Sequence, residues 1–151
     1  MGMDLIYQDE QTKGSIWQSG YREIPWDLQA AAIHLVVYAA SECPPLNHHL
    51  GAEKFSCPND DNMAPPGHPI YDALLANALK GVPKVVEAVK NGKNVLITCN
   101  MGINRSSLIT GLSMKELTSW PAEKIISTIQ TKRPGTLTNP SFKIMLLSKN
   151  N

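Results

Sequence analysis

The sequence predicts an α/β fold, a single domain with a central, mostly parallel, twisted sheet flanked by helices. Leu35–Val37 and Val95–Ile97 are uninterrupted apolar runs, which are typical of strands buried on both faces of a parallel sheet. Segments with helical spacing of apolar residues lie between and after these runs, as in βαβ units. A chain of 151 residues, 42% of them hydrophobic, is long and apolar enough to bury one core of this kind.

The first half of the chain is expected to contain one helix and two strands. Trp26–Ile33 is predicted to be a short helix that leads into a buried strand over His34–Tyr38, around the first apolar run. Lys54–Cys57 is a candidate for a second, short strand. Two stretches with adjacent prolines, 41–51 and 58–69, are expected to be loops.

The second half is expected to begin with two helices and a strand. Ile70–Leu79 and Val82–Lys90 are predicted helices, and Pro83 fits the second because the first turn of a helix leaves its N–H groups unpaired. An Asn91–Gly92 turn then leads into a strand over Asn94–Thr98, which contains the second apolar run.

Three helices are predicted after that strand. Ser106–Thr118 has a broad apolar face, which indicates a helix packed on the sheet. Pro121 opens a second helix with its isoleucines directed inward. Asn139 caps the last helix, which starts at Pro140 and runs through Leu147.

The charge balance excludes several classes of protein. The formal net charge is +1, from 14 basic and 13 acidic residues, and charged residues make up 18% of the chain. This balance argues against a disordered chain and against a broad nucleic-acid binder, which would be clearly basic. No apolar run approaches the roughly 20 residues that cross a bilayer. We therefore expect neither nucleic acid nor a membrane among the partners.

The cysteines and the N-terminus indicate the compartment. Three cysteines cannot all pair, and none lies in a CxxC motif, so neither a disulfide framework nor a zinc site is expected. The N-terminus does not resemble a signal peptide, and Gly2 before a second methionine looks like a remnant of an expression vector. Residues 1–14 are thus expected to be an N-terminal segment that is partly vector-derived. The chain is expected to be a reduced, cytoplasmic, soluble domain without a cofactor.

The loop after the strand Asn94–Thr98 combines residues suited to phosphate chemistry. Cys99 ends the strand, five residues follow, and Arg105 opens a helix. The residues between them are Asn100, Met101, Gly102, Ile103 and Asn104. Five residues can wrap into a semicircle whose backbone N–H groups point inward, at the positive end of the next helix, and Gly102 permits close approach or positive φ. Ligands of parallel sheets bind at the carboxyl ends of strands, so the substrate-binding site is expected here.

The side chains at the ends of this loop have distinct predicted roles. Cys99 at the bottom of the loop is expected to be a thiolate, the nucleophilic form of cysteine. Arg105 offers two parallel N–H donors to two phosphate oxygens, which lysine cannot imitate. Ser106 can donate a hydrogen bond to the sulfur and help it leave in a second step. The alternative is an inert, buried cysteine before a helix whose arginine faces solvent.

The stretch Thr98–Ser107 resembles the active-site signature of the cysteine-dependent protein tyrosine phosphatases, and among them of the compact dual-specificity phosphatases. Ser15–Gly20 resembles the opening strand and glycine of that family, and Ile33–Tyr38 resembles its first hydrophobic strand unit. Arg133–Pro134 and Asn139–Phe142 resemble its closing segment. The resemblance implies a dual-specificity phosphatase-like fold, a phosphocysteine intermediate and no requirement for a metal.

The resemblance also implies a catalytic domain over residues 15–151 and a general acid, an upstream aspartate that protonates the leaving oxygen and then activates water. Asp61, three residues after Pro58 as in many relatives, is the favoured candidate, followed by Asp60. The alternative is a solvated acidic turn. Relatives usually have a histidine, which orients loop carbonyls, where Thr98 stands. We expect one of two consequences: either Thr98 replaces part of that hydrogen bonding, or the activity is lower than in relatives that have the histidine.

Substrate and regulation are less constrained by the sequence. The five loop residues include no lysine or arginine, whereas relatives that act on phosphoinositides or RNA triphosphates tend to add positive charge there. This favours a protein tyrosine or dual-specificity phosphatase acting on a phosphorylated protein or a small phosphoester. A monomer is expected. Two alternatives stay open: a phosphate-binding module without turnover, and a phosphatase for lipid, nucleotide or RNA. Cys43 or Cys57 either protects Cys99 as a disulfide under oxidation or is an inert buried thiol.

Overall fold

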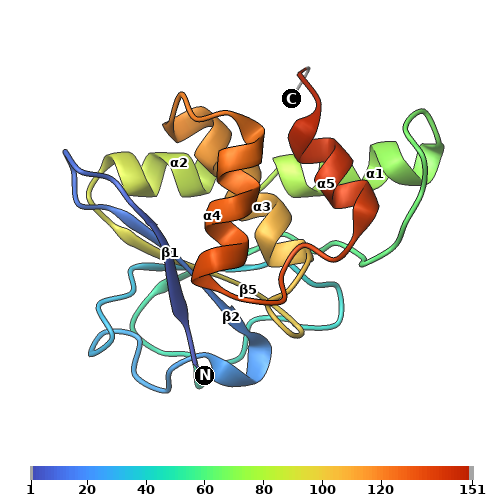
Figure 1. Ribbon diagram of the computed structural model, residues 1–151. Coiled ribbons are helices and arrows are strands. Elements are labelled where there is room, and N and C mark those ends of the chain that lie inside the picture. Colours follow the sequence, from blue (N-terminus) through green and yellow to red (C-terminus); the bar gives the residue numbers. More distant parts are fainter. Residues whose placement is uncertain (1, 150–151) are drawn as a thin grey trace.

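The computed structural model describes residues 2–149 (Figure 1). Five strands in this range form one sheet in the order β1-β2-β5-β3-β4. The strands are β1 (Asp4–Gln8), β2 (Ser15–Gly20), β3 (Leu35–Tyr38), β4 (Glu53–Ser56) and β5 (Asn94–Cys99). Neighbouring strands pair in parallel except β1, which is antiparallel to β2. The predicted α/β domain with a mostly parallel sheet is therefore confirmed.

Both faces of the central strands are covered, which explains the two apolar runs. Alternate residues of a strand point to opposite faces of the sheet. The larger core cluster, which includes the helices, contains Leu35, Val37, Val95 and Ile97. The smaller cluster contains Val36, Tyr38 and Leu96, together with Leu28 and Ile33 from the segment between β2 and β3. Successive positions of β3 and β5 must therefore all be apolar.

The α-helices lie together on one side of the sheet in Figure 1. They are α1 (Pro69–Leu79), α2 (Val82–Lys90), α3 (Arg105–Leu117), α4 (Ala122–Lys132) and α5 (Pro140–Leu147), and a 3-10 helix η1 (Tyr21–Glu23) follows β2. Each predicted helix from residue 70 onward is present within about one residue of its expected ends. Within residues 2–149, none of these helices is long and apolar enough to cross a membrane.

The predicted helix Trp26–Ile33 is wrong. The segment forms consecutive turns, in which Ala32 has a φ of 59° and the Ile33 N–H donates to the Leu28 carbonyl. Leu28 and Ile33 are both buried against the sheet. In a helix, residues five apart point roughly 140° away from each other, so turns bring both side chains inward where a helix would not. Strand β1 was not predicted, because Ile6 is its only buried side chain.

The sheet brings three loops to one edge. β5 lies between β2 and β3, with Gly20 opposite Cys99 and Tyr38 opposite Thr98. The carboxyl ends of these three parallel strands therefore meet. The loop after β5 is bordered by the segments that follow β2 and β3, and it leads directly into α3, whose first ten residues are all buried.

Candidate active site

Cys99 lines a cavity of about 160 Å³ at the carboxyl end of β5. It is 2% exposed, and its sulfur lies 3.3 Å from the hydroxyl oxygen of Ser106, with which it shares a hydrogen bond. Gln18 Nε2 donates to the Ser107 hydroxyl at 2.9 Å and to the Ser106 hydroxyl at 3.4 Å. Because Ser106 accepts from Gln18, its own hydrogen is free to point at the sulfur. The cavity is lined by Asp61, Cys99, Asn100, Met101, Ile103, Asn104, Arg105 and Thr138.

The loop 100–104 passes close to the end of β2 at Gly102. This residue has a φ of 69°, in the left-handed region that favours glycine. A Cβ at this position would lie 2.6 Å from the carbonyl carbon and oxygen of Ser19 and 2.8 Å from Arg133 Nη2. Both the backbone conformation and the lack of space therefore require glycine here.

Arg105 is held in place along one edge of its guanidinium. Its Nη1 and Nη2 donate to the two carboxylate oxygens of Glu42, each at 2.6 Å, and Nη1 also donates to the Asn59 carbonyl at 3.2 Å. Three of the five N–H groups are thus occupied. Nε is buried and has no partner in the described part of the chain, and one N–H of Nη2 is left. These two N–H groups lie along one side of the guanidinium and can donate in parallel to two oxygens of a phosphoryl group.

Glu42 is the residue of the site that sequence reasoning missed. Its side chain is 51% exposed, so it holds Arg105 from the solvent side. Hydrogen bonds from Arg105 lower the pKa of Glu42, so the carboxylate stays charged below the ordinary glutamate range. The stabilisation from this pair is therefore complete above the ordinary glutamate pKa and is lost only as the pH falls through the lowered value. The sequence does contain a signal for Glu42, because this acidic residue shortly follows β3, and β3 pairs with β5, the strand that ends in Cys99.

We expect Glu42→Gln to lower kcat/KM for phosphoester hydrolysis by about 10-fold, because the guanidinium loses its bidentate partner and its orientation. The glutamine amide would present a donor to a group that has only donors. Steady-state kinetics with para-nitrophenyl phosphate measures the effect. Glu53→Gln is the matched control, since it removes the exposed carboxylate that pairs with Lys84. If Glu42→Gln keeps the same kcat/KM as Glu53→Gln and the wild type, Glu42 does not orient Arg105 for the reaction.

Of the two candidate acids, Asp61 lines the cavity and Asp60 does not. Asp61 Oδ1 accepts from Asn139 Nδ2 at 2.9 Å, and Oδ2 accepts from Asn104 Nδ2 at 3.0 Å. These amides fix the carboxylate beside the loop. Asp60 is exposed and accepts from the Ser41 hydroxyl at 3.0 Å. The geometry favours Asp61 as the proton donor, and the role itself stays a prediction.

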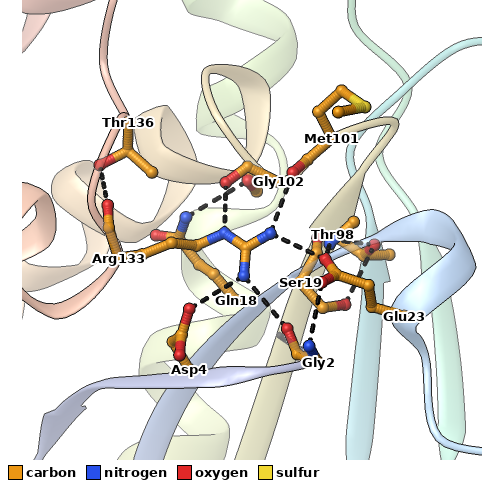
Figure 2. Close-up of polar contacts among 12 residues, drawn as sticks. Gly2, Asp4, Gln18, Ser19, Glu23, Thr98, Met101, Gly102, Arg133 and Thr136 are labelled. Carbon is orange, nitrogen blue, oxygen red and sulfur yellow. Dashed lines mark hydrogen bonds and ion pairs between the residues drawn. The ribbon is translucent and has the colours of Figure 1, made fainter.

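Thr98 is fully buried and bonds to the neighbouring strand. Its hydroxyl donates to a carbonyl of β2 at 3.0 Å, and its nearest acceptor toward the loop is the Cys99 carbonyl at 3.4 Å. The carbonyls of Met101 and Gly102 accept from Arg133, at 3.0 Å and 2.9 Å (Figure 2). Thr98 therefore does not hold these two loop carbonyls.

The other two cysteines, Cys43 and Cys57, are buried and free. Burial raises the pKa of both thiols, and the nearby charge of Glu42 raises that of Cys43 further. Cys57 donates to the Asn77 carbonyl at 3.1 Å. A raised pKa favours the thiol, the less reactive form. Protection of Cys99 by a disulfide stays a prediction.

A larger open groove, of about 580 Å³, lies between β1 and the segment after α3, where Tyr7 and Trp120 line it. Among the described residues that line that groove there is no cysteine or histidine. Among residues 2–149, no three histidine, cysteine or acidic side chains gather as a metal site would require. A cysteine, a guanidinium and a carboxylate instead meet in the smaller cavity at Cys99.

The sequence matches the family model described as dual specificity phosphatase, catalytic domain, over residues 17–151. The matched range contains every residue that lines the cavity. A comparison with curated proteins finds no match.

Solved structures share the fold at low sequence identity. A crystal structure of human DUSP28 has a TM-score of 0.74 at 19% identity, and the match covers 95% of this chain and 90% of that one. Tk-PTP in its active form has a TM-score of 0.68 at 21% identity, over 95% and 93% of the two chains. PTPMT1 in complex with PI(5)P has a TM-score of 0.62 at 16% identity, over 87% of each chain. At these identities the likeness shows the fold alone.

Proposed function

This chain belongs to the dual-specificity phosphatase catalytic-domain family, and we propose that its reaction runs through Cys99, Arg105, Asp61 and Ser106. The family makes it a cysteine-dependent phosphatase rather than a binding module without turnover. The assignment of individual residues rests on one observation. A buried cysteine, a guanidinium with two open N–H donors and a carboxylate line the same cavity.

The first step transfers the phosphoryl group from the substrate oxygen to the Cys99 sulfur. The thiolate attacks phosphorus, the S–P bond forms, and the P–O bond to the leaving group breaks. Asp61 donates its proton to the leaving oxygen. The Nε and Nη2 donors of Arg105, together with the loop amides at the start of α3, bind the equatorial oxygens, where negative charge accumulates.

The second step releases the phosphoryl group to water. Water attacks phosphorus, the Asp61 carboxylate takes its proton, and the S–P bond breaks with the electron pair returning to sulfur. The Ser106 hydroxyl, 3.3 Å from the sulfur, donates a hydrogen bond that stabilises the departing thiolate. Inorganic phosphate leaves, and Asp61 is again protonated for the next cycle.

The proposed substrate is a phosphoester of modest charge, namely phosphotyrosine or phosphoserine/threonine on a protein. Among the described residues that line the cavity, Arg105 is the one cation, and Asp61 adds a negative charge. A substrate with several phosphates would bring further negative charge beside Asp61 without a lysine or second arginine to balance it. A monomeric state and a cytoplasmic location complete the proposal as predictions.

We expect kcat/KM for a phosphotyrosine peptide to exceed that for a polyphosphorylated inositol headgroup by roughly 10-fold, with a shallow dependence on salt. Hydrolysis of both substrates over a series of NaCl concentrations tests this, with EDTA present. A preference for the headgroup that weakens steeply with salt would contradict the substrate class and leave the cysteine chemistry intact. Folded protein that hydrolyses neither substrate would contradict the catalytic assignment.

A further inference from the structure

Arg133, in the segment after α4, binds the loop 100–104 from the side facing β1 (Figure 2). Its Nε donates to the Gly102 carbonyl at 2.9 Å, and its Nη2 donates to the Met101 carbonyl at 3.0 Å. The other acceptors are Gly2 O at 3.1 Å, Asp4 Oδ2 at 3.0 Å and Glu23 Oε1 at 2.8 Å. All five N–H groups of the guanidinium are used, and the side chain is 12% exposed.

These contacts fix the orientation of two peptide planes in the loop. In a trans peptide the carbonyl and the following N–H point in opposite directions, and the described chain has no cis peptide bond. Because the carbonyls of Met101 and Gly102 point to Arg133, the N–H groups of Gly102 and Ile103 point away from it. Neither N–H has a hydrogen-bond acceptor within residues 2–149. Both are thus open to a ligand in the cavity that Met101 and Ile103 line.

Arg133 donates to these two carbonyls from outside the loop. The Thr98 hydroxyl is bonded to the Ser19 carbonyl and does not reach the Met101 or Gly102 carbonyls. Gly102 packs against the end of β2 but, lacking a Cβ, places little intrinsic restriction on φ and ψ, so the direction of the two adjoining carbonyls comes from packing and from the hydrogen bonds of Arg133. The guanidinium holds the two successive carbonyls from two separate nitrogens at a fixed spacing, whereas an ammonium group would have to reach both carbonyls from one nitrogen.

Arg133 is not placed to bind the phosphoryl group itself. It does not line the cavity, and its charge is balanced by ion pairs with Asp4 and Glu23. Its influence on the reaction therefore passes through the loop peptides.

We propose that Arg133 is a positioning residue of the phosphatase reaction, turning the loop so that the Gly102 and Ile103 amides bind the equatorial phosphoryl oxygens. The proposal rests on the proposed function of the Cys99 cavity. These oxygens gain charge in the transition state, so aligned amides bind the transition state more strongly than the substrate. Loss of the alignment therefore lowers kcat more than it raises KM.

The test compares Arg133→Met and Arg133→Lys with Asp4→Asn as the matched control. Arg133→Met keeps the apolar length of the side chain and removes both loop contacts, so we expect kcat and vanadate affinity each to fall by about 10²-fold. Arg133→Lys retains the charge but offers its N–H donors from a single nitrogen without the planar geometry, so its losses should be intermediate. Asp4→Asn removes a charge from the far side of Arg133 and keeps both loop contacts, so both values should stay near those of the wild type. Kinetics with para-nitrophenyl phosphate, inhibition by vanadate and melting temperatures are measured on all four proteins.

Several outcomes would overturn the proposal. One is folded Arg133→Met with wild-type kcat and vanadate inhibition. If that variant does not fold, Arg133→Lys decides: a lower melting temperature with unchanged kcat and vanadate inhibition makes Arg133 a purely structural residue. Equal losses in Asp4→Asn would assign the effect to the N-terminal strand. Failure of the proposed function is a separate result, since it would appear as wild-type hydrolysis by Cys99→Ser.

Discussion

Cys99→Ser is expected to lower kcat for para-nitrophenyl phosphate by about 10⁴-fold or more while the protein stays folded. A serine hydroxyl at this position would remain protonated, because the partner of the Cys99 sulfur is the Ser106 hydroxyl and not a base. The weaker nucleophile would leave the phosphate-binding groups in place but block the first step. Initial rates in the presence of EDTA measure the effect.

The matched control is Cys57→Ser, the same exchange of sulfur for oxygen at another buried cysteine. Cys57 bonds to the Asn77 carbonyl and does not line the cavity, so the rate should stay near that of the wild type. Hydrolysis by Cys99→Ser at the wild-type rate would place the nucleophile elsewhere.

Asp61→Asn is expected to lower kcat by about 10²-fold to 10³-fold for a phosphoserine peptide, and by less for para-nitrophenyl phosphate. An alkoxide must be protonated as it departs, whereas para-nitrophenolate leaves readily as an anion. Initial rates with both substrates measure the two losses, and a larger loss for the phosphoserine peptide is the result expected if Asp61 protonates the leaving oxygen.

Two further variants make the Asp61 test specific. Asparagine at this position would direct an amide at the amides of Asn104 or Asn139, so Asp61→Ala checks that the loss does not come from this clash. Asp60→Asn is the matched control, because Asp60 bonds to Ser41 outside the cavity. If kcat for the phosphoserine peptide stays at the wild-type value in Asp61→Asn and falls in Asp60→Asn, the acid is Asp60.

The fold could be predicted where a local signal was sufficient. The apolar runs in β3 and β5 give both strands because each strand is covered on two faces. Pro140 and the cap at Asn139 mark the start of α5, where the Asn139 side chain accepts from the Phe142 N–H. The segment 26–33 was mispredicted because its shape depends on tertiary contacts, including the hydrogen bond from the Leu28 N–H to the Leu50 carbonyl.

The site could be predicted where its chemistry lies in one continuous stretch. Cys99, Arg105 and Ser106 are linked by spacing along a strand, a loop and a helix start, so the sequence alone brings them together. Glu42 lies 63 residues from Arg105. Arg133 lies 31 residues from Gly102. No spacing rule joins such pairs, and only the meeting of strand ends and the packing of α4 bring them to the loop.

In the proposed reaction the phosphoryl group passes to the sulfur of Cys99. The most direct test uses Asp61→Ala with para-nitrophenyl phosphate, because the first step then needs little acid catalysis while the second step lacks its base. Rapid acid quench, proteolysis and mass spectrometry locate the bound phosphoryl group. We expect a burst of one nitrophenolate per enzyme and one phosphoryl group on the peptide that contains Cys99. A burst with the phosphoryl group on any other residue would contradict it.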